Sequence, residues 1–319
     1  MGRKGLIGLA CVTVGLALAY GFYAQNNAPT ALKAEGALLA DVNLPALNAI
    51  RYVKGEQSIR VALKDGVWVV PEKDEYPASG KAVADLVAHL KDAKKLEART
   101  ANPSLHARLG LAETGSDEEK AARLTLETDK AIELLLGNRS SQEGQLMRFA
   151  GDNQAWLVTP ALNVPTEVNA WLDRRITDIA FADIKNVAVT LKDGTRFEVN
   201  RSENQPNMQV VGLASDSKVP YESAANGMAT VFGGLLFEDV KKLSALPLAT
   251  PEALVELTTL KEHALKAALH VVEDQHWLVI TEHQGFSASE LSAREGWAYR
   301  IEPRHYQALT HNLAKALKP

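Results

Sequence analysis

The chain has 319 residues, of which 46% are hydrophobic and 23% charged, a composition typical of folded rather than disordered chains. This length favours about two domains. The formal net charge of -4 comes from 35 basic and 39 acidic residues, and no basic run could neutralise a series of phosphates, so nucleic acid is not an expected partner. The one cysteine, Cys11, lies in an apolar stretch. The body is therefore expected to hold neither a disulfide nor a cysteine ligand or nucleophile.

The N-terminal segment is typical of a membrane anchor. After Arg3 and Lys4 the chain runs from Gly5 to Ala24 without a charge, which as a helix is long enough to cross a hydrocarbon core of about 30 Å. The basic residues ahead of the run favour a cytoplasmic N-terminus and a periplasmic body. We therefore predict a single-pass inner-membrane protein anchored by residues 1–25. The alternative is a signal peptide cleaved before Tyr20, which would leave the body soluble in the periplasm.

Small residues recur within this segment at a helical spacing. Cys11, Gly15 and Ala19 are four residues apart, which places them on one ridge of a helix. Transmembrane helices approach one another closely along such ridges. These three residues are a candidate docking ridge for a partner helix, although small residues are also common in such segments without any partner.

The sequence after the N-terminal segment contains a similar pattern twice, which predicts an internal repeat. Residues 26–43 are small and polar and are predicted to be a tether, followed by repeats over residues 44–175 and 176–319. Leu-Lys-Asp-Gly occurs at Leu63–Gly66 and again at Leu191–Gly194, each time between runs of alternating apolar residues. Alternation broken by Asp-Gly predicts a β-hairpin.

Each hairpin is expected to be followed by a helix and further strands. The first helix should end in the segment Asp92–Leu96, and the second should run from about Ser223 into the similar segment Glu238–Leu243. The apolar residues of the first helix follow i, i+3, i+4, i+7 spacing, at Val83, Leu86, Val87 and Leu90. The fold class predicted from these patterns is α+β, with two similar repeats, each an antiparallel sheet with a packed helix, behind one transmembrane helix.

A search for chemistry finds no site. His270 and His276 are six residues apart, about 20 Å along one strand and too far to share an ion. His305 and His311 are also six apart and would face different sides of a final helix. Gly285–Ser289 begins like a nucleophile elbow but lacks the closing glycine. No catalytic, metal-binding or cofactor-binding residue is therefore predicted, and the tryptophans are expected to fill the core or sheet faces rather than to form a glycan or peptide platform.

A family resemblance rests on several short phrases in a fixed order. They cover about Leu47 to Arg175 and recur more loosely towards the C-terminus. They are the Lys-Asp-Gly hairpin ending in Trp68, Tyr76-Pro77-Ala78, Leu109-Gly110-Leu111, Ile132 to Gly137, and Trp171-Leu172-Asp173-Arg174-Arg175. With these phrases the chain resembles the bacterial family known as domain of unknown function 4340. The resemblance implies an N-terminal membrane segment and no established catalytic residues. It also implies that the gene for this protein lies beside genes for permease and auxiliary subunits similar to those of gliding-motility ABC transporters.

We therefore expect a non-enzymatic extracytoplasmic accessory or scaffold subunit of an ABC-type transport complex in the inner membrane. An alternative is a periplasmic binding module that holds a lipid, glycan or peptide in a groove between the repeats. An enzyme of unfamiliar type is a third hypothesis, which a cluster of carboxylates or histidines in a cleft would support.

Overall fold

The protein is mainly β. The computed structural model describes residues 36–140, 144–202, 205–212 and 225–310. Strands account for 43% and helices for 19% of these residues, with three α-helices among them. The prediction of two α+β repeats, each with a packed helix, is therefore wrong. The described residues form two compact units. Among them, unit 1 comprises those within 36–42, 89–121 and 135–162, and unit 2 those within 43–88, 122–134 and 163–310.

Unit 1 contains four strands of a ten-stranded antiparallel sheet, in the order β1-β6-β10-β9. Their bounds are β1 Gly36–Ala37, β6 Lys94–Ala98, β10 Trp156–Thr159 and β9 Gln145–Phe149. One apolar cluster in the core of the unit contains Leu111, Leu135 and Ala155, each at most 1% exposed. The single turns η3 (Pro103–Leu105) and η4 (Ala107–Leu109) precede Leu111. A short, loop-rich segment thus supplies part of this core.

Unit 2 contains five further strands of that sheet, in the order β7-β2-β3-β4-β5. Their bounds are β7 Ala122–Glu127, β2 Ala49–Lys54, β3 Gln57–Lys64, β4 Val67–Val70 and β5 Tyr76–Pro77. The boundary between the units falls within β8 (Ala131–Arg139). The buried alternation that we predicted for the first hairpin is present, since Ile59 and Val61 are each 1% exposed.

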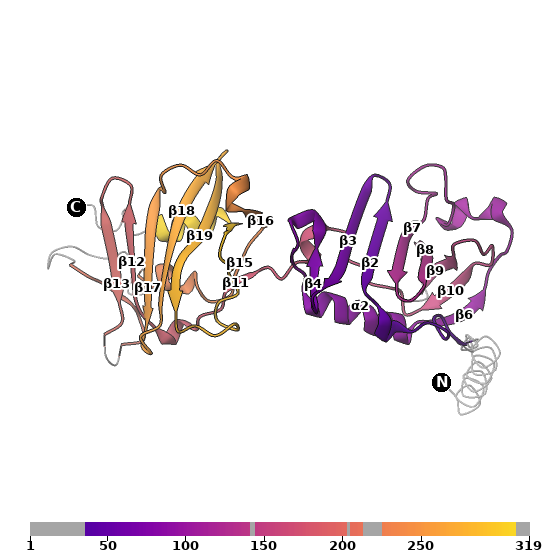
Figure 1. The fold of residues 1–319 in the computed structure, drawn as a ribbon, viewed down its shortest axis with the longest axis horizontal. Helices are drawn as coiled ribbons and strands as arrows, with labels where there is room; N and C mark the ends of the chain where they lie inside the picture. The colour runs from indigo at the N-terminus through magenta and orange to yellow at the C-terminus, as the bar shows by residue number, and fades with distance from the viewer. Residues whose placement is uncertain (1–35, 141–143, 203–204, 213–224, 311–319) are drawn as a thin grey trace, which may run out of the picture. The chain divides into compact units, whose positions relative to one another are not determined.

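Helix α2 (Gly80–Asp92) follows β5 (Figure 1). Ser79 caps its start, because the Ser79 hydroxyl accepts a hydrogen bond from the Ala82 amide at 3.2 Å. Val83, Leu86 and Leu90 are buried, which confirms the predicted apolar face. The helix nevertheless ends at Asp92, and the lysines expected in its last turn belong to strand β6.

An eight-stranded sheet also lies in unit 2, in the order β14-β13-β12-β17-β18-β19-β20-β16 (Figure 1). The strands are β12 Ile184–Leu191, β13 Arg196–Asn200, β14 Gln209–Val210, β16 Asp239–Lys242, β17 Ala253–Thr259, β18 Ala264–Val272, β19 Gln275–Gln284 and β20 Trp297–Arg300. Trp277, Leu278 and Val279 are all buried. Because successive residues of a strand face opposite sides, both faces of β19 are covered at this point.

The helices beside this sheet are short. They are α3 (Asn226–Thr230) and α4 (Pro303–Thr310), and α4 contacts both β12 and β19. A separate two-stranded sheet pairs β11 (Arg175–Thr177) with β15 (Leu235–Leu236). The remaining single turns are η1 Leu44–Ala46, η2 Pro71–Lys73, η5 Val168–Trp171, η6 Phe181–Asp183 and η7 Leu243–Ala245.

The second long helix that we predicted from about Ser223 does not extend past Thr230 within the described residues. Gly234 has a φ of 72°, a left-handed conformation that a helix cannot contain. Beyond it, Leu235 and Phe237 are buried while Leu236 is 45% exposed. This period of two belongs to strands, and the segment that was expected to close the helix forms β16 instead.

Both Lys-Asp-Gly segments connect antiparallel strands, β3 to β4 and β12 to β13, so both predicted hairpins are confirmed. The turns differ in their backbone. In the first, Asp65 and Gly66 have φ values of 50° and 80°, as in a two-residue type I′ turn. In the second, the Asp193 carboxylate accepts a hydrogen bond from the Thr195 amide at 2.9 Å. The predicted domain limits at residues 44–175 and 176–319 stay predictions.

Gly137 in β8 has no space for a side chain. A Cβ atom there would lie 2.5 Å from the Leu109 carbonyl oxygen and 2.8 Å from Leu111 Cδ2. We expect Gly137→Ala to lower the free energy of unfolding by about 1–3 kcal/mol because the backbone of the neighbouring turn must move. Gly80→Ala is the matched control, since nothing lies within 4 Å of a Cβ at Gly80. Urea unfolding of the two variants, followed by circular dichroism, checks the prediction, and equal midpoints would contradict it.

Candidate functional site

The docking ridge predicted at Cys11, Gly15 and Ala19 lies outside the described residues. The same holds for the whole uncharged run from Gly5 to Ala24. Among residues 36–310, wherever the structure describes them, no helix has both the length and the apolarity needed to cross a bilayer. The anchor therefore remains a prediction from sequence.

The prediction that His270 and His276 lie along one strand is wrong. They lie on the neighbouring strands β18 and β19, where Val271 is opposite His276 and His270 is opposite Trp277. The turn between the strands contains Glu273 and Asp274, with φ values of 51° and 61°. Such positive φ values at two consecutive residues form a tight hairpin turn. The two imidazoles face opposite sides of the sheet, because neighbours along a strand alternate.

Each of these histidines has a separate environment. His270 Nδ1 lies 3.0 Å from the Ala249 carbonyl oxygen, and burial lowers the pKa of the His270 imidazole. The His276 ring lies 4.1 Å from the Tyr306 ring of α4. Within the described part of the chain, no three His, Cys, Asp or Glu side chains gather closely enough to hold a metal ion. His311 lies outside it.

The segment that begins like a nucleophile elbow is a local cap. The Ser287 amide and hydroxyl donate hydrogen bonds to Glu290 Oε2 at 2.9 and 2.7 Å. These hydrogen bonds lower the pKa of the Glu290 carboxyl group. The serine hydroxyl is thus held by a carboxylate three residues on, as in a capping box.

A pocket of about 410 Å³ lies in the second unit, beside the first turn of α4. Its lining comes from two segments, the glycine-rich chain around α3 and β15 and the start of α4. Arg304 Nε lies 2.8 Å from Glu302 Oε2 in an ion pair. The lining residues are Gly227, Thr230, Val231, Gly233, Gly234, Leu236, Glu302, Arg304, His305 and Ala308.

His305 is the titratable group of this pocket with a shifted pKa. Its Nδ1 atom is buried and has no hydrogen-bond partner among the described residues. Burial, and then the neighbouring Arg304, lower the pKa of the His305 imidazole. A neutral imidazole can donate one hydrogen bond and accept another. The polar groups in the lining of this pocket are thus the His305 imidazole and the ion pair of Arg304 with Glu302. The sequence placed His305 on a helix but gave no signal for the pocket.

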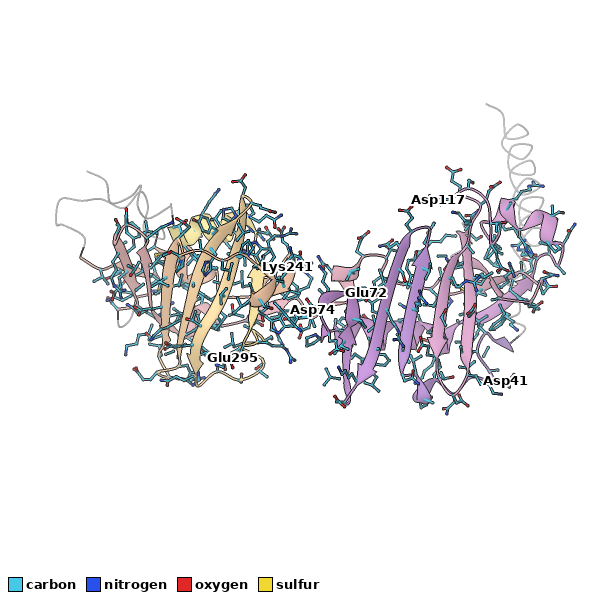
Figure 2. All side chains as sticks on the ribbon, turned by 45° about the horizontal axis from the view of Figure 1, so that its top comes forward. Asp41, Glu72, Asp74, Asp117, Lys241 and Glu295 are labelled. Carbon is cyan, nitrogen blue, oxygen red and sulfur yellow. The ribbon has the colours of Figure 1, made fainter. Side chains whose placement is uncertain are left out.

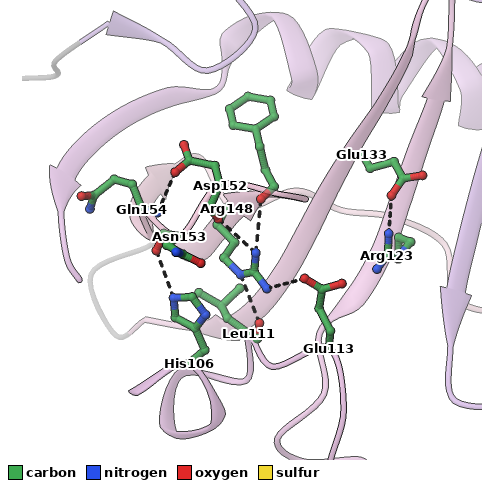
Figure 3. A network of polar contacts seen from close by, with 10 residues as sticks. His106, Leu111, Glu113, Arg123, Glu133, Arg148, Asp152, Asn153 and Gln154 are labelled. Carbon is green, nitrogen blue, oxygen red and sulfur yellow. Dashed lines mark hydrogen bonds and ion pairs between the residues drawn. The ribbon is translucent and has the colours of Figure 1, made fainter. Parts of the chain in front are cut away.

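A buried arginine lies at the centre of a polar network in unit 1 (Figure 3). The Arg148 side chain is 5% exposed and its guanidinium lies 2.9 Å from Glu113 Oε1. The same guanidinium donates to the carbonyl oxygens of Leu111, Phe149 and Asp152 at 3.3, 3.4 and 3.0 Å. Its donors are directed at backbone rather than at a cavity, so we assign Arg148 a role in folding.

A lysine and two aromatic rings lie together on one face of β6, β9 and β10. Lys95 Nζ lies 5.0 Å from the centre of the Trp156 ring and 5.6 Å from that of Phe149. Lys94 is exposed but points to the opposite face of the sheet, because successive residues of a strand alternate. We call Lys95, Phe149 and Trp156 the β6 surface. In unit 2, Lys241 and Lys242 of β16 lie 5.6 and 5.8 Å from the rings of Trp277 and Trp297. The recurring Lys-Lys-Leu phrase was visible in the sequence, whereas the rings beneath the lysines were not.

Comparison with known proteins gives one match. The sequence profile of the family described as Domain of unknown function (DUF4340) matches residues 68–267. No match was found among the curated proteins or among the solved structures. The matched residues make up more than half of the chain, in agreement with the resemblance that its phrases indicated. This protein belongs to the DUF4340 family.

Proposed function

We propose that this protein is a non-enzymatic extracytoplasmic accessory or scaffold subunit of an ABC-type transport complex in the bacterial inner membrane. The observation that carries the proposal is the uncharged run from Gly5 to Ala24, preceded by Arg3 and Lys4 and followed by a large folded body. Such a chain is held beside other membrane proteins through one helix. The body is then available for contacts outside the cytoplasm.

The surface of the body supports a role in binding other proteins. Charged side chains of both signs stand on its exterior, among them the labelled residues of Figure 2. On the eight-stranded sheet, ion pairs link neighbouring strands, with Lys192 and Glu252 at 2.8 Å and Lys266 and Glu282 at 2.7 Å. Ordered charges of both signs favour a specific partner of complementary pattern over unrelated ones.

The test is recovery of membrane partners from mild detergent with a tagged full chain. Gly15→Leu should reduce the recovered partner several-fold, because a bulky residue on the ridge keeps a second helix from approaching closely. Ala17→Leu is the matched control, since two residues along a helix point to nearly the opposite side. A reporter active only in the periplasm, fused after Pro319, should be active in both variants.

Two results would contradict the proposal. Equal partner recovery from Gly15→Leu and Ala17→Leu would show that the ridge does not bind a partner helix. Substrate turnover by the purified chain, lost on a single carboxylate or histidine substitution, would place the function in an active site instead.

A second candidate function is a periplasmic binding module, and the pocket beside α4 favours it. Its volume of about 410 Å³ is within the range of small-molecule sites. His305 and Arg304 are polar residues of its lining. A small molecule retained by the purified chain in native mass spectrometry, and lost on His305→Ala, would favour this function over the scaffold.

A further inference from the structure

We infer that the β6 surface of unit 1 lies against the bilayer and binds anionic lipid headgroups. Lys95 would contact the phosphates, and Trp156 and Phe149 would lie at headgroup level. This inference rests on the proposed function, because it requires the run from Gly5 to Ala24 to be in the membrane.

The length of the chain limits how far β6 can lie from the predicted end of the anchor. Strand β1 is the first described element, and it pairs with β6 so that Gly36 is opposite Lys95 and Ala37 is opposite Lys94. The Leu38 amide also donates to the Ala93 carbonyl oxygen at 2.8 Å. Only about eleven residues separate Ala24 from Gly36, and even fully extended they span at most about 40 Å. The β6 surface is therefore held within reach of the headgroups.

The side chains of the β6 surface suit that position. Lys95, Phe149 and Trp156 are half-buried. The Lys95 ammonium lies over the two rings, and long lysine side chains can carry such a charge from an apolar surface to the headgroups. Tryptophan is enriched at the headgroup level, and basic residues near the bilayer are attracted to anionic lipids.

The charge around this surface is positive. Lys91 in the last turn of α2 is exposed and adds a second ammonium group, and Asp92 next to it carries an exposed carboxylate. Glu97 of β6 is neutralised by Arg99, whose Nη1 lies 3.1 Å from Glu97 Oε1. The cations thus outnumber the free carboxylates along residues 91–99.

Unit 2 provides an internal control. Lys241 and Lys242 of β16 also lie over tryptophan rings, so the chemistry is nearly the same as on β6. No predicted anchor is joined to β16 by a short segment. Proximity to the anchor, rather than lysine and tryptophan alone, is what the inference requires.

The experiment places a fluorescent label near each surface in the full chain. In a Cys11→Ala background, a cysteine is introduced by Lys91→Cys, or for comparison by Lys192→Cys in the β12–β13 turn, and labelled. The chain is reconstituted into nanodiscs of phosphatidylcholine, with or without phosphatidylglycerol, that contain lipids with a nitroxide quencher in the headgroup. We expect quenching at position 91 with phosphatidylglycerol, weak quenching without it, and little at position 192.

Charge reversal then tests the residues. Lys95→Glu should lower the ratio of docked to undocked chain at least about tenfold, and high salt should act in the same direction. Lys241→Glu with Lys242→Glu should leave quenching at position 91 unchanged. The inference is overturned if quenching at position 91 is the same with and without phosphatidylglycerol and is not changed by charge reversal on β6. A chain that does not enter nanodiscs at all refutes the anchor and the inference together, whereas one that enters but stays unquenched refutes the inference alone.

Discussion

Tyr76→Ala is expected to lower the free energy of unfolding of unit 2 by about 3–5 kcal/mol, the usual cost of deleting a buried aromatic ring. Tyr76 is 1% exposed. Its ring packs edge to face against Phe237 at 5.4 Å and Trp297 at 5.0 Å. The substitution therefore leaves a cavity between β5 and residues more than one hundred positions further along the chain.

The hydroxyl group of Tyr76 allows a matched control. The Tyr76 ring lies 6.3 Å from the Tyr299 ring, whose hydroxyl accepts a hydrogen bond from the Arg294 amide at 2.6 Å. Tyr76→Phe keeps the ring and removes only the hydroxyl group, which costs about 1 kcal/mol or less. Urea unfolding of the full chain followed by tryptophan fluorescence measures both variants. Equal losses in the two would show that the ring itself contributes nothing.

Alkaline pH provides a second measurement on the same group. Burial raises the pKa of Tyr76 and of Tyr299, while tyrosines of the unfolded chain lose their protons near pH 10. Above that pH the unfolded chain binds fewer protons than the folded chain, so stability falls as the pH rises. The Tyr76→Phe variant should lose stability less steeply than the parent above about pH 10. Parallel pH profiles would contradict this expectation.

Arg148→Met is expected to destabilise unit 1 by about 2–4 kcal/mol, since three carbonyl oxygens lose their donor inside the protein. Methionine keeps most of the length and apolar volume of the side chain, so the loss reports mainly on the guanidinium. Arg148 is among the few buried charged residues of the described chain, at 5% exposure. The network it holds is shown in Figure 3.

Glu113→Gln is the control for Arg148. The Glu113 side chain is 47% exposed, and ion pairs with exposed partners contribute about 1 kcal/mol or less. We therefore expect the glutamine variant to unfold close to the parent. Hydrogen exchange of the amides in β9 and β10 separates local loosening from global unfolding. An Arg148→Met variant as stable as Glu113→Gln would show that the backbone contacts of the guanidinium do not matter.

Features that depend on near neighbours in the sequence could be predicted. The two Asp-Gly turns, at Gly66 and Gly194, form hairpins as expected, because a turn residue with positive φ between alternating apolar residues is a local signal. The buried face of α2, with Val83, Leu86 and Leu90, follows from helical spacing alone. The family also could be inferred from short phrases in order along the chain.

Features that depend on distant contacts were decided by the tertiary structure. The segment Glu238–Leu243 resembles the segment that follows α2, yet its core pairs with β20 as a strand. Lysines and leucines occur in either element, and the partner strand is fixed only when the sheet forms. The positions of Tyr76 against Phe237 and of Lys95 against Trp156 likewise had no local signal. The sequence by itself determined the hairpin turns, the one amphipathic helix and the charge-free N-terminal run. Which rings, lysines and carbonyl groups meet depended on strand pairing, because residues far apart in the chain become neighbours only through that pairing.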